Sequence, residues 1–292
     1  MRITVLGATG MIGSRIASAL EDSGHEVVRA SRSTGVDALS GTGLEAALRG
    51  ADAAVDALNL ETMSVRKAVD FFAGSAQNIV NAMRRAGVPR LICVSIAGAA
   101  DPAVHRRFGY YRGKAVQEEV YRRAGAAGAA GAAGAAGAAG AAGAAGAGGV
   151  SQAGAGPEVV LVRSTQWYEL IDDLVGRASL GPVAVVPTMR IAALPVDSAA
   201  EFTAALVRGD RAPGAGNGQE SGGVGIAAIR GPEVSTVRAA ARRIRGVRGS
   251  VGGRRVLLMG ELPYLGPAIA RGGLVPIDAE IDSVTLDDWL AR

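Results

Sequence analysis

The chain begins Met1-Arg-Ile-Thr-Val-Leu-Gly-Ala-Thr-Gly-Met-Ile-Gly13, an apolar run that breaks into three glycines. Apolar residues then recur at helical spacing through residues 12–20, and a second apolar run follows at residues 25–32. This order predicts a strand, a tight turn, a helix that begins among the glycines and a second strand. The glycines therefore lie inside a βαβ unit.

A turn of this kind suits the pyrophosphate of a dinucleotide. A side chain at Gly7 or Gly10 would hold the backbone away from the phosphates, and the N–H groups at the helix N-terminus face an anion. The alternative is a glycine-rich turn without a ligand, in a chain that has 43 glycines. The order of strand, turn, helix and strand favours the nucleotide. The cofactor contacts predicted in this turn are Gly7, Thr9, Gly10, Met11, Ile12 and Gly13.

The end of the second strand distinguishes NAD from NADP. A carboxylate there would accept hydrogen bonds from the ribose hydroxyls of NAD, whereas the 2′-phosphate of NADP requires cations and hydroxyl donors. The sequence supplies Ser31, Arg32 and Ser33, with no acidic residue before Asp37. We therefore predict NADP, with a guanidinium forked onto the phosphate. Either Arg29 or Arg32, but not both, is expected to be an ordinary solvated charge.

Strands and amphipathic helices continue to alternate along the 292 residues, which are enough to bury a full core. We expect one NAD(P)-binding unit over residues 1–292, an α/β protein with a Rossmann-like, doubly wound parallel sheet and a small C-terminal α/β lobe. Residues 1–165 form the cofactor-binding core, and residues 166–292 supply the remaining core elements and a lobe for substrate or partner. Further elements expected are strands at residues 51–58, 90–95 and 158–164 and a helix at 76–86 that ends at Gly87.

Two low-complexity segments interrupt this pattern. The first, at about residues 124–156, repeats Gly-Ala-Ala. We expect a disordered or partly helical insertion, because each glycine costs a helix about 1 kcal/mol relative to alanine and no larger side chain can pack on the core. The second, residues 212–223, reads as a flexible loop.

Several functional classes are disfavoured by the composition. The single cysteine, Cys93, lies in an apolar run, so we expect a small core residue and no intrachain disulfide. His25 and His105 stand apart from clustered acids or thiols, which predicts no metal site. With a strand from the second residue and no leader pattern, a cytoplasmic protein without membrane spans is expected. The arginines of residues 238–248 and a net charge of +4 permit nucleic acid binding, but a solvated helix face is favoured.

Tyr110 and Lys114 are candidates for the chemistry, because they lie one helical turn apart and project from the same face. An ammonium near the phenol lowers its pKa and can also hold the ribose of the cofactor. Ser95, at the end of the strand over residues 90–95, is expected to hydrogen-bond a substrate carbonyl and orient it against Tyr110. Tyr111, three residues before Lys114, is the alternative proton donor.

Other polar and aromatic residues are expected near the same sheet edge. Asn59 is assigned either to the ribose or phosphate of the cofactor or to a turn, and Asp37 either to the adenine or to a turn. Gln166, Trp167 and Tyr168 follow the strand over residues 158–164, and we expect them to contact a small-molecule substrate.

Together these motifs resemble the atypical short-chain dehydrogenase/reductase group, and more narrowly its NmrA-like NAD(P)-binding proteins of the actinobacterial type. The stretches that carry the resemblance are residues 7–13, 31–32, 94–95, 110–114, 163–166 and 231–233. The resemblance implies a Rossmann core, a small lobe and NADP binding. It also implies one of two functions: NADPH-dependent reduction of a small carbonyl, quinone or related electrophile, or non-catalytic NADP(H) sensing through a protein partner. Many NmrA-like proteins lack the catalytic tyrosine, so Tyr110 favours the enzyme.

Overall fold

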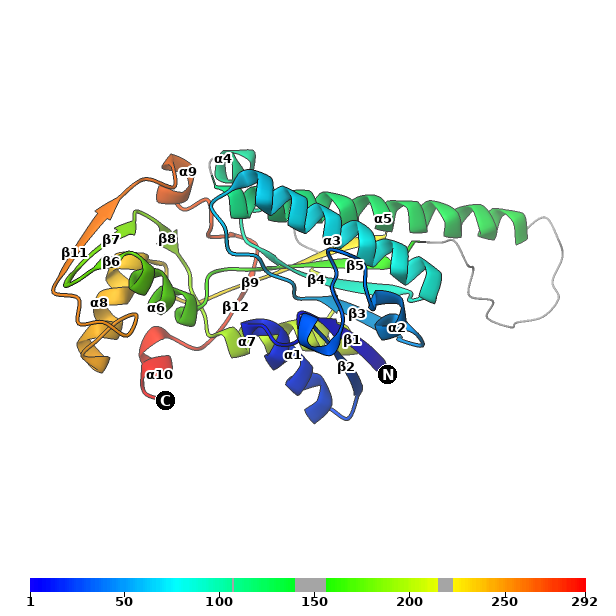
Figure 1. Cartoon of the computed structure of the whole chain (residues 1–292), viewed down its shortest axis with the longest axis horizontal. Helices are drawn as coiled ribbons and strands as arrows, with labels where there is room; N and C mark the ends of the chain where they lie inside the picture. Colours follow the sequence, from blue (N-terminus) through cyan, green and yellow to red (C-terminus); the bar gives the residue numbers. More distant parts are fainter. Residues whose placement is uncertain (107, 140–155, 215–222) are drawn as a thin grey trace.

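A parallel sheet forms the centre of the molecule. The computed structural model describes residues 1–106, 108–139, 156–214 and 223–292, and in these residues seven strands are ordered β12-β9-β5-β4-β3-β1-β2 (Figure 1). The strands are β1 Arg2–Leu6, β2 Glu26–Ala30, β3 Ala53–Asp56, β4 Arg90–Ile96, β5 Glu158–Ser164, β9 Val224–Arg230 and β12 Glu280–Ile281. All neighbouring pairs are parallel. Because the chain passes from β1 to β2 on one side and then to β3 on the other, the direction of winding reverses between β1 and β3, which is where ligands bind in such sheets. The expected Rossmann-like architecture is confirmed.

Helices cover both faces of the sheet (Figure 1). One face packs on α1 (Met11–Asp22) and α7 (Val196–Arg208), and the other on α2 (Leu44–Leu48), α3 (Val65–Ala86) and α5 (Gly109–Ala139). Side chains of β4 alternate between these layers: Ile92 and Val94 belong to the first, and Leu91 and Cys93 to the second. Cys93 is therefore a buried core residue, as expected.

Helices α3 and α5 lie side by side along much of their length (Figure 1). Gly113 permits this close approach, because a Cβ atom there would lie 2.5 Å from the Phe72 ring and 3.0 Å from the Ala68 carbonyl oxygen. The sequence prediction of a helix over 76–86 was correct at its end, where Gly87 is left-handed, but wrong at its start. The helix begins eleven residues earlier, after Ser64, whose hydroxyl accepts the Lys67 N–H.

The glycine- and alanine-rich segment continues helix α5 to Ala139, and residues 140–155 lie outside the described residues. Although the segment has no large side chain, its first turn packs on the rest of the protein. Ala124, Gly125 and Gly128 are buried, and a Cβ at Gly128 would lie 2.2 Å from the Gly156 carbonyl oxygen. The chain thus leaves the body of the protein at Gly128 and returns beside it at Gly156.

The remaining elements form a lobe beside the carboxyl ends of the central strands (Figure 1). A three-stranded sheet of order β11-β7-β6 and a two-stranded ribbon of β8 and β10 build it with four helices. The lobe elements are α6 Tyr168–Arg177, β6 Ser179–Leu180, β7 Val183–Pro187, β8 Arg190–Ile191, β10 Ser235–Thr236, α8 Val237–Arg248, β11 Leu258–Leu262, α9 Pro267–Ala270 and α10 Leu286–Leu290. A short helix, α4 Pro102–His105, packs against α5 and α9.

Helix α8 carries the arginine-rich stretch, and part of its charge is used inside the protein. Arg243 forms ion pairs with Glu233 and Asp287, and the Arg248 guanidinium lies over the Trp289 ring. None of the described helices is both long enough and apolar enough to cross a membrane.

Candidate active site

The glycines of the turn after β1 are of two kinds: Gly7 and Gly13 are required by packing, and Gly10 faces solvent. Gly7 is left-handed, and a Cβ there would lie 2.8 Å from the Ala57 carbonyl oxygen. A Cβ at Gly13 would lie 2.2 Å from the Gly7 carbonyl oxygen, so both glycines are required by the packing of the chain on itself. Gly10 is exposed, and a Cβ atom there would meet only the Gly7 carbonyl oxygen, at 3.2 Å. Its small size leaves the backbone at the N-terminus of α1 open to a ligand, and no acidic residue lies in that first turn.

The end of β2 lies directly beside this turn, because the Gly7 N–H donates to the Ala30 carbonyl at 2.9 Å. Ser31 is buried, and its hydroxyl lies 2.8 Å from that of Ser33. Arg32 is exposed, and its guanidinium makes no hydrogen bond or ion pair with any described residue. The position fits a cofactor phosphate that reaches past the turn.

Arg29 and Asp37 have partners within the protein. The Arg29 guanidinium donates to Glu21 at 2.6 Å and to Ser18 at 2.9 Å, on the surface of α1. Asp37 accepts the Leu39 N–H at 2.9 Å, which is the geometry of a turn. Arg32 is therefore the better of the two arginines for the cofactor.

A cavity of about 560 Å³ opens at the carboxyl ends of β1, β3, β4 and β5, with a wall from α6 of the lobe. It spans the point where the winding of the sheet reverses. The predicted site residues that line it are Gly10, Met11, Ile12, Asn59, Ser95, Tyr110, Lys114, Gln166 and Trp167. The predicted residues outside its lining are Gly7, Thr9, Gly13, Ser31, Arg32, Ser33, Asp37 and Tyr168.

Tyr110 and Tyr111 both line this cavity, at the start of α5. Their rings meet edge to face, with centroids 5.9 Å apart. The Tyr110 hydroxyl makes no hydrogen bond with any described residue, whereas the Tyr111 hydroxyl accepts from the Gln166 amide at 3.4 Å. Burial raises the pKa of Tyr110 well above its usual value, and the Glu61 carboxylate adds to the rise. Both phenols therefore keep their protons at neutral pH.

Lys114 is buried and holds the ends of two strands together. Its ammonium donates to the Val94 carbonyl at 2.9 Å, to the Leu58 carbonyl at 3.4 Å and to the Gln117 amide oxygen at 2.9 Å. It also lies 4.7 Å from the centre of the Phe72 ring. The expected lowering of the Tyr110 pKa by this ammonium is not found, because burial, Glu61 and Cys93 all raise that pKa.

Ser95 faces a group that the sequence analysis missed. Its hydroxyl donates to the Glu118 carboxylate at 2.6 Å. Glu118 is fully buried and also accepts from Arg163 at 2.7 Å and from Arg122 at 2.8 Å. The only sequence signal was its spacing of four residues after Lys114, which places both side chains on one helix face.

A second buried group, Asp56 at the end of β3, was also missed. Its carboxylate accepts from the Tyr121 hydroxyl at 2.5 Å and from the Gln117 amide at 2.7 Å. Because Gln117 also accepts from Lys114, hydrogen bonds connect the candidate lysine to Asp56 on the neighbouring strand.

The aromatic residues after β5 divide between the cavity and the lobe. Trp167 lines the cavity, and its indole N–H donates to the Ser164 hydroxyl at 2.9 Å. Tyr168 instead packs on Trp289 in the lobe core, with ring centroids 5.3 Å apart. Tyr168 begins helix α6 with its ring turned into the lobe and lies outside the cavity lining, so its contact with substrate stays a prediction.

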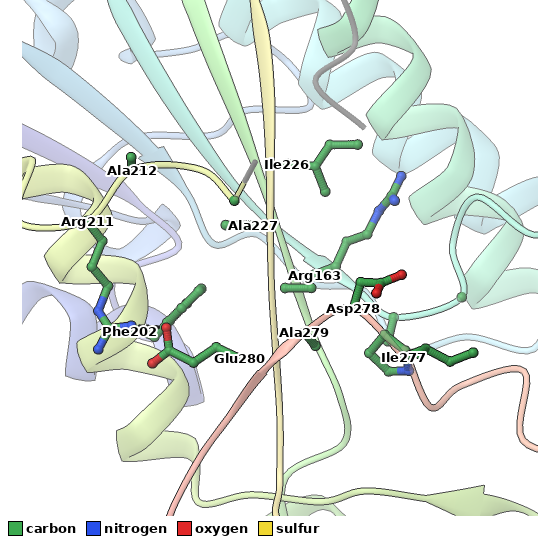
Figure 2. Close-up of a pocket in the computed structure, with 15 residues that line it drawn as sticks. Arg163, Phe202, Arg211, Ala212, Ile226, Ala227, Ile277, Asp278, Ala279 and Glu280 are labelled. Atoms are coloured by element: carbon green, nitrogen blue, oxygen red, sulfur yellow. Dashed lines mark hydrogen bonds and ion pairs between the residues drawn. The ribbon is translucent and has the colours of Figure 1, made fainter. Parts of the chain in front are cut away.

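A second cavity, of about 640 Å³, lies on the other side of β5, along β9 and residues 276–280 (Figure 2). Figure 2 shows Arg163 reaching from this cavity toward α5, where Glu118 accepts its hydrogen bonds. No residue of the glycine turn lines it. In the described part of the chain, no group of three metal-ligating side chains occurs.

Comparisons with known proteins agree with this geometry. Residues 7–130 match the model of an NAD(P)H-binding family. No curated protein is similar enough in sequence to count as a relative.

Solved structures share the fold over the whole chain. An NADPH-dependent quinone oxidoreductase from Escherichia coli, complexed with NADPH, is 14% identical with a TM-score of 0.61, covering 100% of this chain and 99% of the other. A UDP-glucose 4-epimerase from Bifidobacterium longum, in complex with NAD⁺ and UDP, is 14% identical with a TM-score of 0.61, covering 100% and 96%. A short-chain dehydrogenase/reductase superfamily protein from Agrobacterium tumefaciens, with bound NAD, is 15% identical with a TM-score of 0.58, covering 100% and 95%.

At these identities the solved structures establish the fold alone, and the narrower NmrA-like assignment stays a prediction. Residues 7–130 are thus similar to an NAD(P)H-binding family, and the whole chain shares its fold with these solved structures.

Proposed function

We propose that the protein is an NADPH-dependent reductase of a small carbonyl compound or quinone, with Tyr110 as the proton donor. The observation that carries this proposal is the Tyr110 hydroxyl, which has no partner among the described residues and belongs to a cavity that also contains the N-terminus of α1. A protonated phenol suits reduction, because the carbonyl oxygen needs a proton as it gains negative charge.

The residues of the chain fit a dinucleotide. Gly10 and the first turn of α1 would hold the pyrophosphate, and Arg32 with the Ser31 and Ser33 hydroxyls would hold a 2′-phosphate. Lys114, inside α5, and Asn59, shortly after β3, line the same cavity and would meet the ribose. When bound, the cofactor supplies a hydride to the substrate carbonyl carbon.

The lining of the cavity favours an uncharged substrate. Five of the eleven Phe, Tyr and Trp side chains of the protein line this one cavity: Phe108, Tyr110, Tyr111, Trp167 and Tyr264. The charged residues of the lining are Glu61, Lys114, Asp173 and Arg177. Lys114 is held by carbonyl oxygens, and Arg177 forms ion pairs with Glu61 and Asp173.

A diphosphate such as the UDP of the epimerase needs cations that are not already neutralised. The substrate end of this cavity offers none among its described residues, which supports a small carbonyl or quinone over a nucleotide sugar.

Tyr110→Phe tests the proposal, with Tyr111→Phe as the matched control. NADPH oxidation is followed at 340 nm over a panel of aromatic aldehydes, ketones and quinones. We expect Tyr110→Phe to lower kcat by about 100-fold or more, because general acid catalysis contributes about 10²–10⁴-fold. NADPH affinity, measured by fluorescence titration, should stay within about twofold, since the phenol acts only as charge develops in the transition state.

Two other outcomes would show which part of the proposal is wrong. A large loss in Tyr111→Phe with normal turnover in Tyr110→Phe would move the proton donor by one residue. Tight NADPH binding without turnover of any compound would contradict the enzyme and favour an NADP(H)-sensing protein.

A further inference from the structure

Ser95 lines the cavity, but the single proton of its hydroxyl points away from the cavity. It donates that proton to a Glu118 carboxylate oxygen at 2.6 Å, and Ser95 is 5% exposed. A hydroxyl has one proton and two lone pairs, so only the lone pairs remain for a ligand. In this arrangement Ser95 is a hydrogen-bond acceptor toward the cavity.

Glu118 is built to stay ionised and so to keep that proton. Although burial raises its pKa, the hydrogen bonds and charge of Arg163 outweigh this, with help from Ser95 and Arg122, and the pKa lies below its usual value. An ionised carboxylate is an acceptor only and cannot return a proton to the serine oxygen. Figure 2 shows Arg163 extended toward α5, the helix of Glu118.

The charged groups around Ser95 all come from elements that pack together here. Lys114 and Glu118 lie on α5, Asp56 ends β3, and Arg163 lies on β5. The Lys114 ammonium donates to the Val94 carbonyl and to Gln117, and the structure gives it no hydrogen bond to the serine oxygen. A donor for Ser95 must therefore be supplied by the ligand.

We propose that Glu118 is a positioning residue that fixes Ser95 as an acceptor, and that the cavity takes carbonyl compounds with a hydroxyl or amino donor beside the reducible carbonyl. The substrate class rests on the proposed reductase function. The neighbouring hydroxyl of such a substrate donates to Ser95, and the carbonyl oxygen is left to Tyr110. This replaces the expectation that Ser95 donates to the carbonyl.

A thiol in place of the Ser95 hydroxyl shows, without any substrate, whether the group at position 95 donates its proton to Glu118. In a Cys93→Ala background, the pKa of the thiol in Ser95→Cys is measured from thiolate absorbance at 240 nm and from its alkylation rate by iodoacetamide. An adjacent carboxylate disfavours the thiolate, so we expect a thiol pKa at least about one unit above the ordinary 8.5. Adding Glu118→Gln should lower the thiol pKa by about one unit, so that alkylation at pH 8 becomes about tenfold faster.

An ordinary or lowered thiol pKa while Glu118 is present would overturn the positioning role. Burial also raises the pKa of a thiol, so the change in pKa on removing the carboxylate carries the test. If Glu118→Gln prevents folding, Glu118→Asp takes its place, and a thiol pKa that does not change would overturn the positioning role.

The substrate class is tested with two ketones of equal size, 2-hydroxyacetophenone and propiophenone, which differ by a hydroxyl in place of a methyl group. In the unmutated protein we expect a higher kcat/KM for the hydroxy ketone. Ser95→Ala should lower the ratio of the two kcat/KM values by about 3- to 10-fold, the size of one hydrogen bond. An unchanged ratio would overturn the proposed class.

The two proposals fail differently. Reduction of quinones or aldehydes but of neither ketone would refute the substrate class and leave the reductase intact. No turnover of any compound would refute the reductase and its substrate class, and the thiol titration would still decide the role of Glu118.

Discussion

The Tyr121 hydroxyl and the Asp56 carboxylate meet at 2.5 Å in the interior, where both residues are fully buried. This hydrogen bond joins the middle of α5 to the end of β3, one turn beyond the Gln117 that also donates to Asp56. The same helix carries Tyr110 and Lys114, so the bond helps to fix the candidate catalytic residues relative to the sheet.

Tyr121→Phe should therefore lower the free energy of unfolding by about 1–3 kcal/mol, the cost of leaving a buried carboxylate short of a donor. Urea denaturation measures it. The matched control is Tyr264→Phe, because that side chain is 52% exposed and should change the stability by less than about 0.5 kcal/mol. Equal effects of the two substitutions would contradict a structural role for the buried pair.

The glycine turn makes a prediction that separates folding from binding. Gly13→Ala places a Cβ at 2.2 Å from the Gly7 oxygen, so we expect severe destabilisation or no soluble protein. Gly10→Ala meets only one atom, at 3.2 Å, and should fold. Its methyl group stands where the ligand approaches, so NADPH affinity should fall about tenfold or more. Thermal unfolding and fluorescence titration distinguish the two, and tight binding by Gly10→Ala would place the pyrophosphate elsewhere.

The turn could be predicted from sequence because its cause is local. Gly7 has a left-handed backbone conformation and Gly13 packs against the Gly7 carbonyl oxygen, and such local requirements appear directly as residue types. The start of α3 was not predicted, because its apolar pattern is weak. The signal was present in Ser64 and the spacing of Ala68, Phe72 and Ala76, but the residues between them are mostly polar or small.

Glu118 and Asp56 could not be found in the same way. A glutamate within Gln-Glu-Glu on a helix has the appearance of a solvated surface residue, and only the packing of β4 and β5 beside α5 turns it into a buried acceptor. Its partners Ser95 and Arg163 are 23 and 45 residues away in sequence. Spacing along one helix indicates which side chains share a face, but not which face is buried.

Glu118 also predicts how stability depends on pH. Its pKa is lower in the folded protein than the value of 4.5 for an isolated side chain, so the unfolded chain takes up a proton first as the pH falls. The stabilisation is complete above about pH 4.5 and is lost as the pH drops through the folded pKa. Glu118→Gln removes the buried charge that the partly buried Arg122 and Arg163 share, and should cost about 3–5 kcal/mol at pH 7.

Denaturation at pH 7 and at pH 4 provides the measurement. The difference in free energy of unfolding between Glu118→Gln and the unmutated protein should be smaller at pH 4 than at pH 7. The surface variant Glu119→Gln should have the same free energy of unfolding as the unmutated protein at both pH values. A difference that widens on acidification would mean that Glu118 is protonated in the folded protein.

The alanine- and glycine-rich segment gives a prediction about the chain between Gly128 and Gly156, which lie in contact. Replacing residues 131–155 with a four-residue Gly-Ser linker should preserve or slightly raise stability, since each halving of a loop lowers its closure cost by about 0.6 kcal/mol. Gly128→Val should instead destabilise by about 1–3 kcal/mol, because its side chain would meet Gly156. Thermal unfolding compares them, and a large loss in the linker variant would show that the segment supports the core.

Arg32 predicts which of the two cofactors the protein prefers. Its guanidinium is exposed beside the buried Ser31, without a hydrogen bond or ion pair to any described residue, whereas the Arg29 guanidinium is held by Glu21. We expect the unmutated protein to bind NADPH at least about tenfold more tightly than NADH, since a charged hydrogen bond contributes about 1.5–3 kcal/mol. Arg32→Glu should remove or reverse this preference, because a carboxylate repels the 2′-phosphate and accepts from a free ribose hydroxyl.

Arg29→Gln is the matched control and should keep the preference for NADPH within about threefold, since it changes a neighbouring arginine that faces α1. Dissociation constants from fluorescence titration at two salt concentrations complete the test. The NADPH affinity of the unmutated protein should weaken with salt more than the NADH affinity, because the additional contact is ionic. Equal affinity for both cofactors before any substitution would mean that the end of β2 does not read the 2′ position, whatever Arg32→Glu then does.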